Sequence, residues 1–184
     1  MRLRMTRGAV VLALLLLAAV VMPAGGRAQG GKFAGDGFTA SFPGRPQKVT
    51  RRQDFDDLAL NMASYGIDRE GMSFFVSMVG DFPAFVMNRP EIDEVFYSQL
   101  EQNLILTAKE SGKGDLTVAA RSDVSLEGTG GRQYVFDSEV NMGVLRAYKS
   151  GRRFYAVGVF GPKQSYVAER AVSFLNSFRL TASK

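Results

Sequence analysis

"RPEIDEVFYSQLEQNLILTAKESG", residues 89–112, places a helical pattern between two groups of β-like segments. Its apolar residues recur at steps of three and four positions, which puts them on one face of a helix. These residues are Ile92, Val95, Phe96, Leu100 and Leu104. Pro90 suits the first turn of a helix, and Gly112 suits its end. The spacing therefore predicts one amphipathic helix between these two residues.

β-like segments flank this helix on both sides. Upstream, residues 38–43 alternate between apolar and polar side chains, and two further apolar segments enclose the turn residues 68–71. The strand candidates are residues 38–43, 58–67, 72–79, 116–126, 132–140, 143–149 and 152–160, and a second helix is predicted over 165–178. Consecutive strands joined by tight turns form an antiparallel sheet, against which amphipathic helices bury their apolar faces. We therefore expect an α+β fold, with an antiparallel β-sheet of about six to seven strands packed with two amphipathic helices.

Residues 1–28 have the pattern of a cleaved secretory signal. Three arginines precede an apolar run over residues 8–22, and residues 26–28, Gly-Arg-Ala, offer the small-x-small pattern of a cleavage site. The apolar run has about 15 residues, fewer than the roughly 20 that a membrane-spanning helix needs. We therefore expect an extracytoplasmic protein, periplasmic or secreted, with no stable membrane anchor after cleavage.

The rest of the chain is interpreted as one domain. Residues 29–37 are rich in Gly and are predicted to form a flexible lead-in. Residues 38–181 contain all the predicted strands and helices, and their length suits a single α+β domain.

The basic charge of the chain lies mainly in the predicted signal. Four of the 23 Lys and Arg residues fall within residues 1–28, and all 18 acidic residues follow that segment. The remaining 19 basic residues therefore exceed the acidic ones by only one. The basic net charge of the whole chain is then no sign of a nucleic-acid partner, and none is expected.

The sequence contains neither Cys nor His. Disulfides, zinc sites of the usual His/Cys type, Ser-His-Asp triads and Cys-His dyads are therefore excluded. A glycine-containing loop ends at Pro162, which has no N–H to offer a phosphate group, so a phosphate-binding loop is not expected there. We expect no cofactor and no catalytic activity.

An acidic cluster lies in residues 51–57, RRQDFDD, which contain Asp54, Asp56 and Asp57. Carboxylates at this spacing occur in calcium loops. The segment lacks the Gly at the bend and the final bidentate Glu of such a loop, and its two arginines compete for the carboxylates. We therefore predict a solvated charged turn and no metal site.

A candidate binding surface arises at the hairpin around residues 150–151. If these two residues form the turn, position 148 pairs with 153 and position 146 pairs with 155. The alternation of side chains then brings Arg146, Tyr148, Arg153 and Tyr155 to one face, each Arg opposite a Tyr. If residues 141–142 form a second two-residue turn, Asp137 lies opposite Arg146.

This Arg/Tyr face has two interpretations. The favoured one is cross-strand cation–π and ion pairing on a solvated sheet face. The alternative is a recognition patch for a partner, because Arg and Tyr are enriched at the hot spots of interfaces.

Asp137 and Glu139 suggest a separate, enzymatic alternative. They fall on the same face of the predicted strand, about 7 Å apart. Glycosidases use two carboxylates at comparable separations, but in a cleft usually lined by large aromatic residues. With no Trp and no second carboxylate pair in view, surface charge is the favoured interpretation.

Three segments resemble small exported bacterial proteins with a PsbP-like layout, which are mostly uncharacterised. These segments are GFTASFPGRP (37–46), GRRFYAVGVFGP (151–162) and AVSFLNSFRL (171–180). The resemblance implies an antiparallel sheet sandwiched by helices, an α/β/α sandwich, whose last helix ends in a Ser-Phe-aliphatic signature, here residues 177–180. It also implies a non-catalytic assembly, binding or accessory role, and it carries over no catalytic residue. The absence of Trp departs from the plant PsbP proteins, so a photosynthetic role is not implied.

The residues and the resemblance together favour a non-catalytic exported accessory or binding domain, which acts on an unknown protein or cell-envelope partner. Its candidate surface is the Arg/Tyr face. Two alternatives stay open: a carboxylate-dependent hydrolase of envelope polymers that uses Asp137 and Glu139, and a protein whose sheet and helices enclose a lipid or other small apolar ligand.

Overall fold

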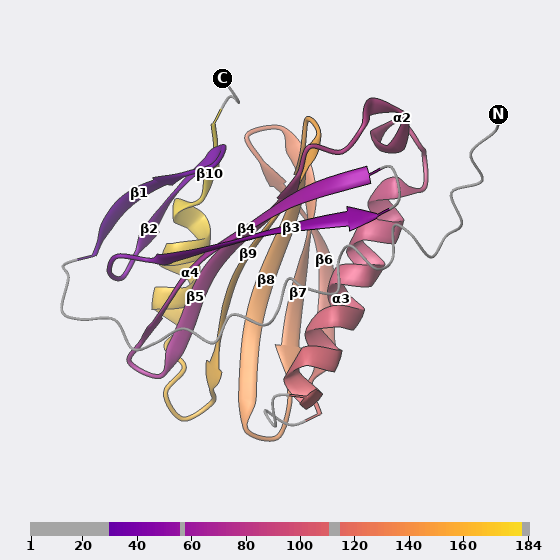
Figure 1. The fold of residues 1–184 in the computed structure, drawn as a ribbon. Helices are drawn as coiled ribbons and strands as arrows, with labels where there is room; N and C mark the ends of the chain where they lie inside the picture. The colour runs from indigo at the N-terminus through magenta and orange to yellow at the C-terminus, as the bar shows by residue number, and fades with distance from the viewer. Residues whose placement is uncertain (1–29, 56–57, 111–114, 182–184) are drawn as a thin grey trace.

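The computed structural model describes residues 30–55, 58–110 and 115–181, which form ten strands and three helices (Figure 1). The first five strands are β1 (Gly31–Gly35), β2 (Phe38–Phe42), β3 (Gln47–Phe55), β4 (Leu58–Arg69) and β5 (Met72–Gly80). The helices α2 (Ala84–Met87) and α3 (Ile92–Glu110) follow. The remaining elements are β6 (Thr117–Leu126), β7 (Thr129–Asp137), β8 (Asn141–Ser150), β9 (Arg153–Pro162), α4 (Ala168–Ser177) and β10 (Arg179–Leu180).

The strands form two sheets in which all neighbours are antiparallel. Seven strands make a large sheet in the order β3-β4-β5-β9-β8-β7-β6, and three short strands make a small sheet in the order β1-β2-β10. The predicted α+β fold with an antiparallel sheet is confirmed. Six of the seven predicted strands lie in the large sheet, which also contains the unpredicted β3. The remaining one, predicted over residues 38–43, is β2 of the small sheet, and this separate sheet was not predicted.

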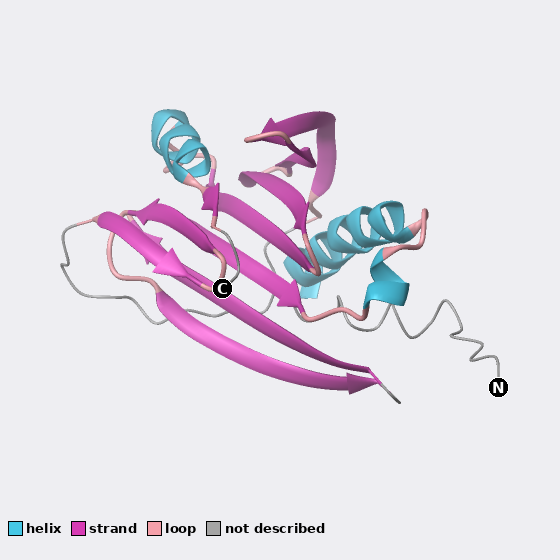
Figure 2. Ribbon diagram, turned by 90° about the horizontal axis from the view of Figure 1, so that it is seen from above, coloured by secondary structure: helices cyan, strands magenta, loops and turns pink. Residues whose placement is uncertain are grey.

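Helices cover both faces of the large sheet. On one face α3 packs together with α2, and Phe96 of α3 stacks on Phe154 of β9 with ring centroids 3.9 Å apart. On the other face lie α4 and the small sheet, where Phe174 of α4 contacts Phe74 of β5 with centroids 5.4 Å apart. Figures 1 and 2 show α3 and α4 lying apart, with strands between them.

Tight turns with left-handed backbone close two of the hairpins. Glu70 and Gly71 have φ angles of 51° and 78° between β4 and β5, and Glu127 and Gly128 have 51° and 85° between β6 and β7. Positive φ at both central residues is the conformation of a type I′ turn, which suits the twist of the flanking strands. The hairpin predicted around residues 68–71 is therefore confirmed, with strands that reach further toward the turn.

Two segments differ from the sequence-based predictions. Residues 51–55, expected to belong to a charged turn, lie in β3, which pairs along its length with β4. Charged side chains are tolerated there because β3 is an edge strand of the large sheet. Asp54 is part of this strand, while Asp56 and Asp57 lie outside the described residues.

The second difference concerns the predicted flexible lead-in over residues 29–37. Within it, Gly31–Gly35 form β1, which pairs with β2 in a continuous antiparallel register. The glycine content suggested a loop, but backbone N–H and C=O groups pair in the same way whatever the side chain. Tertiary pairing therefore overrides the local preference.

The predicted first helix is confirmed as α3, within the limits set by Pro90 and Gly112. The part of the chain described here contains no helix that is both long and apolar enough to cross a membrane. The signal predicted over residues 1–28 lies outside the described residues and stays a prediction.

Candidate functional site

The β8–β9 hairpin carries four of the five candidate residues, and its register differs from the predicted one. Its turn consists of Gly151 and Arg152 rather than residues 150–151. The relevant cross-strand pairs are Arg146–Val157, Tyr148–Tyr155 and Ser150–Arg153. The pairing is shifted by two positions, and because side chains alternate with a period of two, the four candidates still share one face. The predicted face is therefore confirmed, whereas the predicted Arg–Tyr pairs are wrong.

Both tyrosines of this face are buried in the core. Tyr148 and Tyr155 are each 2% exposed, because Phe178, the residue after α4, covers them. The ring of Tyr148 stacks on Phe178 with centroids 5.8 Å apart, and the Tyr155 hydroxyl donates to the backbone oxygen of Asp36 at 3.3 Å. The expectation that these rings lie on a solvated face is wrong, since α4 and the small sheet cover them.

Arg146 joins the sheet to α4. Its Nε donates to Oε1 of Gln133 on β7, and its Nη1 donates to Oδ1 of Asn176 on α4, each at 2.8 Å. A guanidinium that links two elements in this way fixes the position of the helix over the sheet. We therefore assign Arg146 to the packing of α4.

Asp137 and Glu139 do not form the expected carboxylate pair on one strand. β7 ends at Asp137, and Glu139 lies in the exposed turn that follows. Asp137 lies opposite Met142 rather than Arg146, because the β7–β8 turn begins one residue after it. Its carboxylate forms an ion pair with Lys163 at 2.9 Å, with both side chains partly exposed. Neither carboxylate lines the pocket described next.

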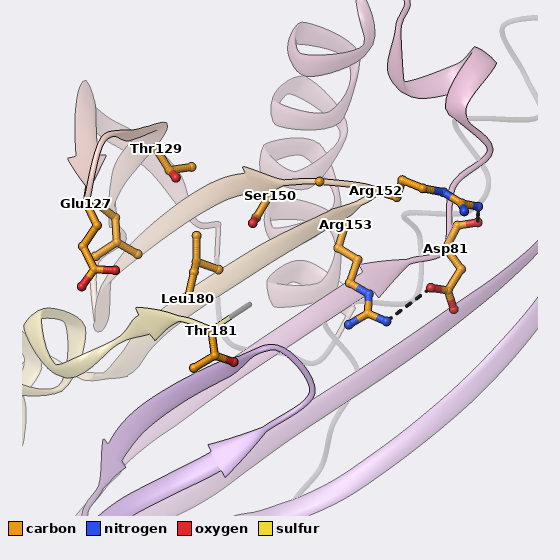
Figure 3. A pocket seen from close by; sticks show the side chains of 10 residues that line it. Asp81, Glu127, Thr129, Ser150, Arg152, Arg153, Leu180 and Thr181 are labelled. Atoms are coloured by element: carbon orange, nitrogen blue, oxygen red, sulfur yellow. Dashed lines mark hydrogen bonds and ion pairs between the residues drawn. The ribbon is translucent and has the colours of Figure 1, made fainter. Parts of the chain in front are cut away.

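A pocket of about 540 Å³ lies at one end of the large sheet (Figure 3). Segments far apart in the sequence build it: the β6–β7 turn, the β8–β9 turn, β10 with the following Thr181, and Asp81 after β5. Its lining mixes charged groups, the hydroxyls of Thr129, Ser150 and Thr181, and the apolar side chains of Leu126 and Leu180. One of the five candidate residues, Arg153, lies here.

Arg153 extends from the first residue of β9 into this pocket (Figure 3). Its Nη2 atom lies 3.4 Å from Oδ1 of Asp81. A hydrogen bond with the Tyr155 hydroxyl is the main cause that raises the pKa of Arg153, whose guanidinium is charged at neutral pH like that of any arginine. Gly80 leaves room for its stem, since a Cβ atom there would lie 2.8 Å from Cγ of Arg153. The position of the Arg153 side chain therefore depends on Asp81, Tyr155 and Gly80.

Asp81 holds the opposite wall through its own hydrogen bonds. Its backbone is in the left-handed region, with φ of 67°, which Asp tolerates better than most residues. Nδ2 of Asn61 donates to its Oδ2 at 2.8 Å. This hydrogen bond is the main cause that lowers the pKa of Asp81, and the nearby Arg153 lowers it further. Asp81 is therefore an ionised carboxylate at neutral pH.

Arg152, the second residue of the β8–β9 turn, is bound to the backbone of the segment after β5. Its Nε donates to the carbonyl oxygen of Phe82, and its Nη2 donates to that of Asp81 at 3.1 Å. The N–H of Phe82 in turn donates to the carbonyl oxygen of Arg152 at 3.3 Å. These contacts lock the β8–β9 turn onto the segment after β5 and so keep the pocket wall in place.

The pocket lining carries two arginines and two carboxylates, and Arg179 from outside the lining adds one positive charge next to it. Glu127 forms an ion pair with Arg179 at 3.3 Å, so these two balance each other. Asp81 is then the lining carboxylate that is left to balance Arg152 and Arg153. Across residues 30–55, 58–110 and 115–181, no group of three or more Asp and Glu side chains has the geometry to hold a metal ion. The arrangement is suited to holding an anionic group.

Sequence reasoning singled out Arg153 but missed Asp81, Thr129 and Thr181. Asp81 and Thr181 lie 100 residues apart along the chain and share one pocket only because β5 and β10 end, and β9 begins, at the same edge of the structure. No pattern of spacing in the sequence indicates this meeting.

Comparison with known proteins shows the fold. The chain is similar to the solution structure of cyanobacterial PsbP (CyanoP) from Synechocystis sp. PCC 6803, with a TM-score of 0.56 and 10% sequence identity. The similarity covers 88% of this chain and 98% of that chain. No family model and no curated protein sequence matches the chain. The fold is therefore PsbP-like, as the resemblance of the sequence implied.

Proposed function

We propose that this chain is a non-catalytic accessory domain that binds a protein partner through the pocket lined by Arg153, at the end of the large sheet that lies next to β10. The observation that carries the proposal is the position of Arg153, a charged guanidinium held inside a pocket that distant chain segments build. A concave site with a few fixed polar groups is the default location for a ligand. The role that the resemblance to PsbP-like proteins implies is of the same class.

The proposed place of action is outside the cytoplasm. The pattern of residues 1–28, with its arginines, apolar run and small residues before the cleavage point, supports export. A domain that keeps its fold without any cysteine is also compatible with an oxidising compartment.

The charged groups of the pocket support binding rather than acid–base catalysis. A general acid at neutral pH needs a carboxyl group whose pKa is raised toward 7. The pKa of Asp81 is lowered instead, through its hydrogen bond from Asn61. Asp81 thus serves as a fixed counter-ion that orients Arg153.

Site-specific crosslinking in cells tests the proposal. A photoreactive amino acid at position 181, in the pocket lining, is expected to capture a discrete partner that mass spectrometry identifies. The same amino acid at position 109, on the exposed end of α3, is the matched control and is expected to capture none. Arg153→Gln in the same chain is expected to abolish the product from position 181.

Identical products from the two positions would contradict the proposal. So would a product from position 181 that persists in the Arg153→Gln variant, because the guanidinium would then have no part in binding.

A further inference from the structure

The guanidinium of Arg153 has hydrogen-bonding capacity that its neighbours do not fill. A guanidinium carries five N–H donors in a planar fork. That of Arg153 donates to the Tyr155 hydroxyl, and Asp81 contacts one nitrogen at 3.4 Å, longer than the usual ~2.9 Å, so the remaining N–H groups are left for a ligand. The fork matches the geometry of a carboxylate, which it binds through two parallel hydrogen bonds.

The groups beside Arg153 favour a carboxylate attached to an aliphatic group. Leu126 and Leu180 lie in the lining and are partly exposed. An inorganic phosphate or sulfate ion would leave these apolar surfaces in water, whereas a branched aliphatic side chain would cover them. The hydroxyls of Thr129 and Ser150 provide donors and acceptors for an adjacent amide.

The shape of the pocket favours the end of a chain over a small free acid. The pocket is partly open to solvent rather than fully enclosed. Sites for small molecules typically bury most of the ligand surface. An open site of about 540 Å³ instead leaves a path for a longer molecule to continue outward.

We infer that the pocket binds the C-terminus of a partner polypeptide, with its free carboxylate on Arg153 and an aliphatic last side chain against Leu126 and Leu180. This inference rests on the proposed function and names the part of the partner that the pocket recognises. The positive charge left after Glu127 pairs with Arg179 provides the electrostatic complementarity.

Titrations of the protein, in the form purified from its host, test this inference by NMR. The first probe is acetyl-Ala-Ala-Leu with a free carboxylate, and the second is the same tripeptide as its C-terminal amide. The free acid is expected to shift the backbone amide signals of Thr129, Ser150 and Thr181 and to bind at least about tenfold more tightly than the amide, because only the acid forms a charged pair with Arg153. A third probe, 4-methylpentanoate, has the aliphatic carboxylate without the peptide and is expected to bind more weakly than the tripeptide.

Three variants separate the guanidinium from general effects on the fold. Arg153→Gln is expected to weaken the free acid about tenfold and to leave the amide unchanged. Thr129→Glu adds a negative charge on another strand without touching the contacts of Arg153, and it is expected to weaken the acid severalfold and the amide little. Arg121→Gln, whose side chain pairs with Glu101 on the α3 face, is the matched control and is expected to bind all probes as the unmodified protein does.

Equal affinities for the acid and the amide would overturn the inference, and so would unchanged acid binding in both pocket variants. If 4-methylpentanoate binds as tightly as the tripeptide, the ligand is a small acid and the inference is wrong. If none of the probes binds at about 10 mM while position 181 still captures a partner in cells, the C-terminus is excluded as the recognised part and the proposed function stands.

Discussion

The hydroxyl of Tyr65 donates a 2.7 Å hydrogen bond to the carboxylate of Asp36, and this contact joins the two sheets. Tyr65 lies in β4 of the large sheet, and Asp36 lies in the turn between β1 and β2. Nζ of Lys48 donates to the same carboxylate oxygen at 2.9 Å. The hydrogen bond from Tyr65 is the main cause that lowers the pKa of Asp36, and the one from Lys48 comes next. The folded protein therefore stabilises the ionised form of the Asp36 carboxylate.

The first prediction concerns the acid stability that follows from Asp36. Its folded-state pKa lies below the ordinary value of 3.8, so its contribution is present above that value and is lost as the pH falls through the folded-state pKa. Asp36→Asn is expected to lower the free energy of unfolding by about 1 kcal/mol at pH 7, a modest amount because the contact is half exposed. Urea unfolding should show this difference shrinking below about pH 4. A difference that stays constant down to the acid limit of folding would refute the assignment.

The second prediction compares how much the buried tyrosines and Arg153 contribute to the free energy of unfolding. Tyr148→Ala and Tyr155→Ala each remove a ring that is 2% exposed, and each is expected to lower the free energy of unfolding by about 3 kcal/mol or more. Arg153→Gln is expected to cost about 1 kcal/mol or less, since the side chain is partly exposed and its ion pair is long. Urea unfolding of the three variants measures these values. An Arg153→Gln loss as large as that of the tyrosines would mean that Arg153 is a core residue rather than a binding residue.

The third prediction concerns Gly80, whose missing side chain makes room for Arg153. An alanine there would place Cβ 2.8 Å from Cγ of Arg153 and 2.9 Å from Sδ of Met78, so both side chains must move. Gly80→Ala is expected to reduce partner capture from position 181 severalfold, with a loss of stability of about 1–2 kcal/mol. Gly130→Ala, at an exposed site where a Cβ has no neighbour within 4 Å, is the control and should change neither quantity. Unchanged capture in Gly80→Ala would show that the exact placement of the guanidinium is unimportant.

The fourth prediction concerns alkaline pH. Burial raises the pKa of Tyr134 from 10.0 to about 12, and its hydroxyl donates to the backbone oxygen of Tyr97 at 3.2 Å. A raised folded-state pKa means that the stability which this hydroxyl contributes is fully present below pH 10 and is lost as the pH rises toward 12. The unmodified protein should therefore lose up to about 2 kcal/mol over this range through Tyr134, and Tyr134→Phe should lose less. Parallel slopes for the two proteins would count against this role of Tyr134.

Local periodicity was sufficient to predict the helices and turns whose conformation depends on a few neighbouring residues. Ile92, Phe96 and Leu100 repeat with the period of a helix, and α3 forms where they lie. The turn at Glu70 and Gly71 likewise followed from turn residues between two apolar segments. β3 escaped prediction because charged residues such as Arg51 and Arg52 do not alternate as a half-buried strand does. Its pairing with β4 decides the conformation.

The candidate site was predictable in part for the same reason. The alternation of β8 and β9 correctly placed Arg146, Tyr148, Arg153 and Tyr155 on one face. It carried no information about what covers that face, and the cover is Phe178 with α4 over the tyrosines. Arg153 escapes this cover because it is the first residue of β9 and lies in the pocket lining.

The order of residues alone settled the two longer helices, the hairpin turn at residues 70–71 and which side chains of β8 and β9 share a face, since these depend on backbone preferences over a few positions. Only the tertiary structure decided what covers each face of the β8–β9 hairpin and which side chains line the pocket at the end of the sheet. Asp81, Arg153 and Thr181 come together through packing between distant strands, and long-range packing follows from the sum of many weak contacts rather than from any short motif.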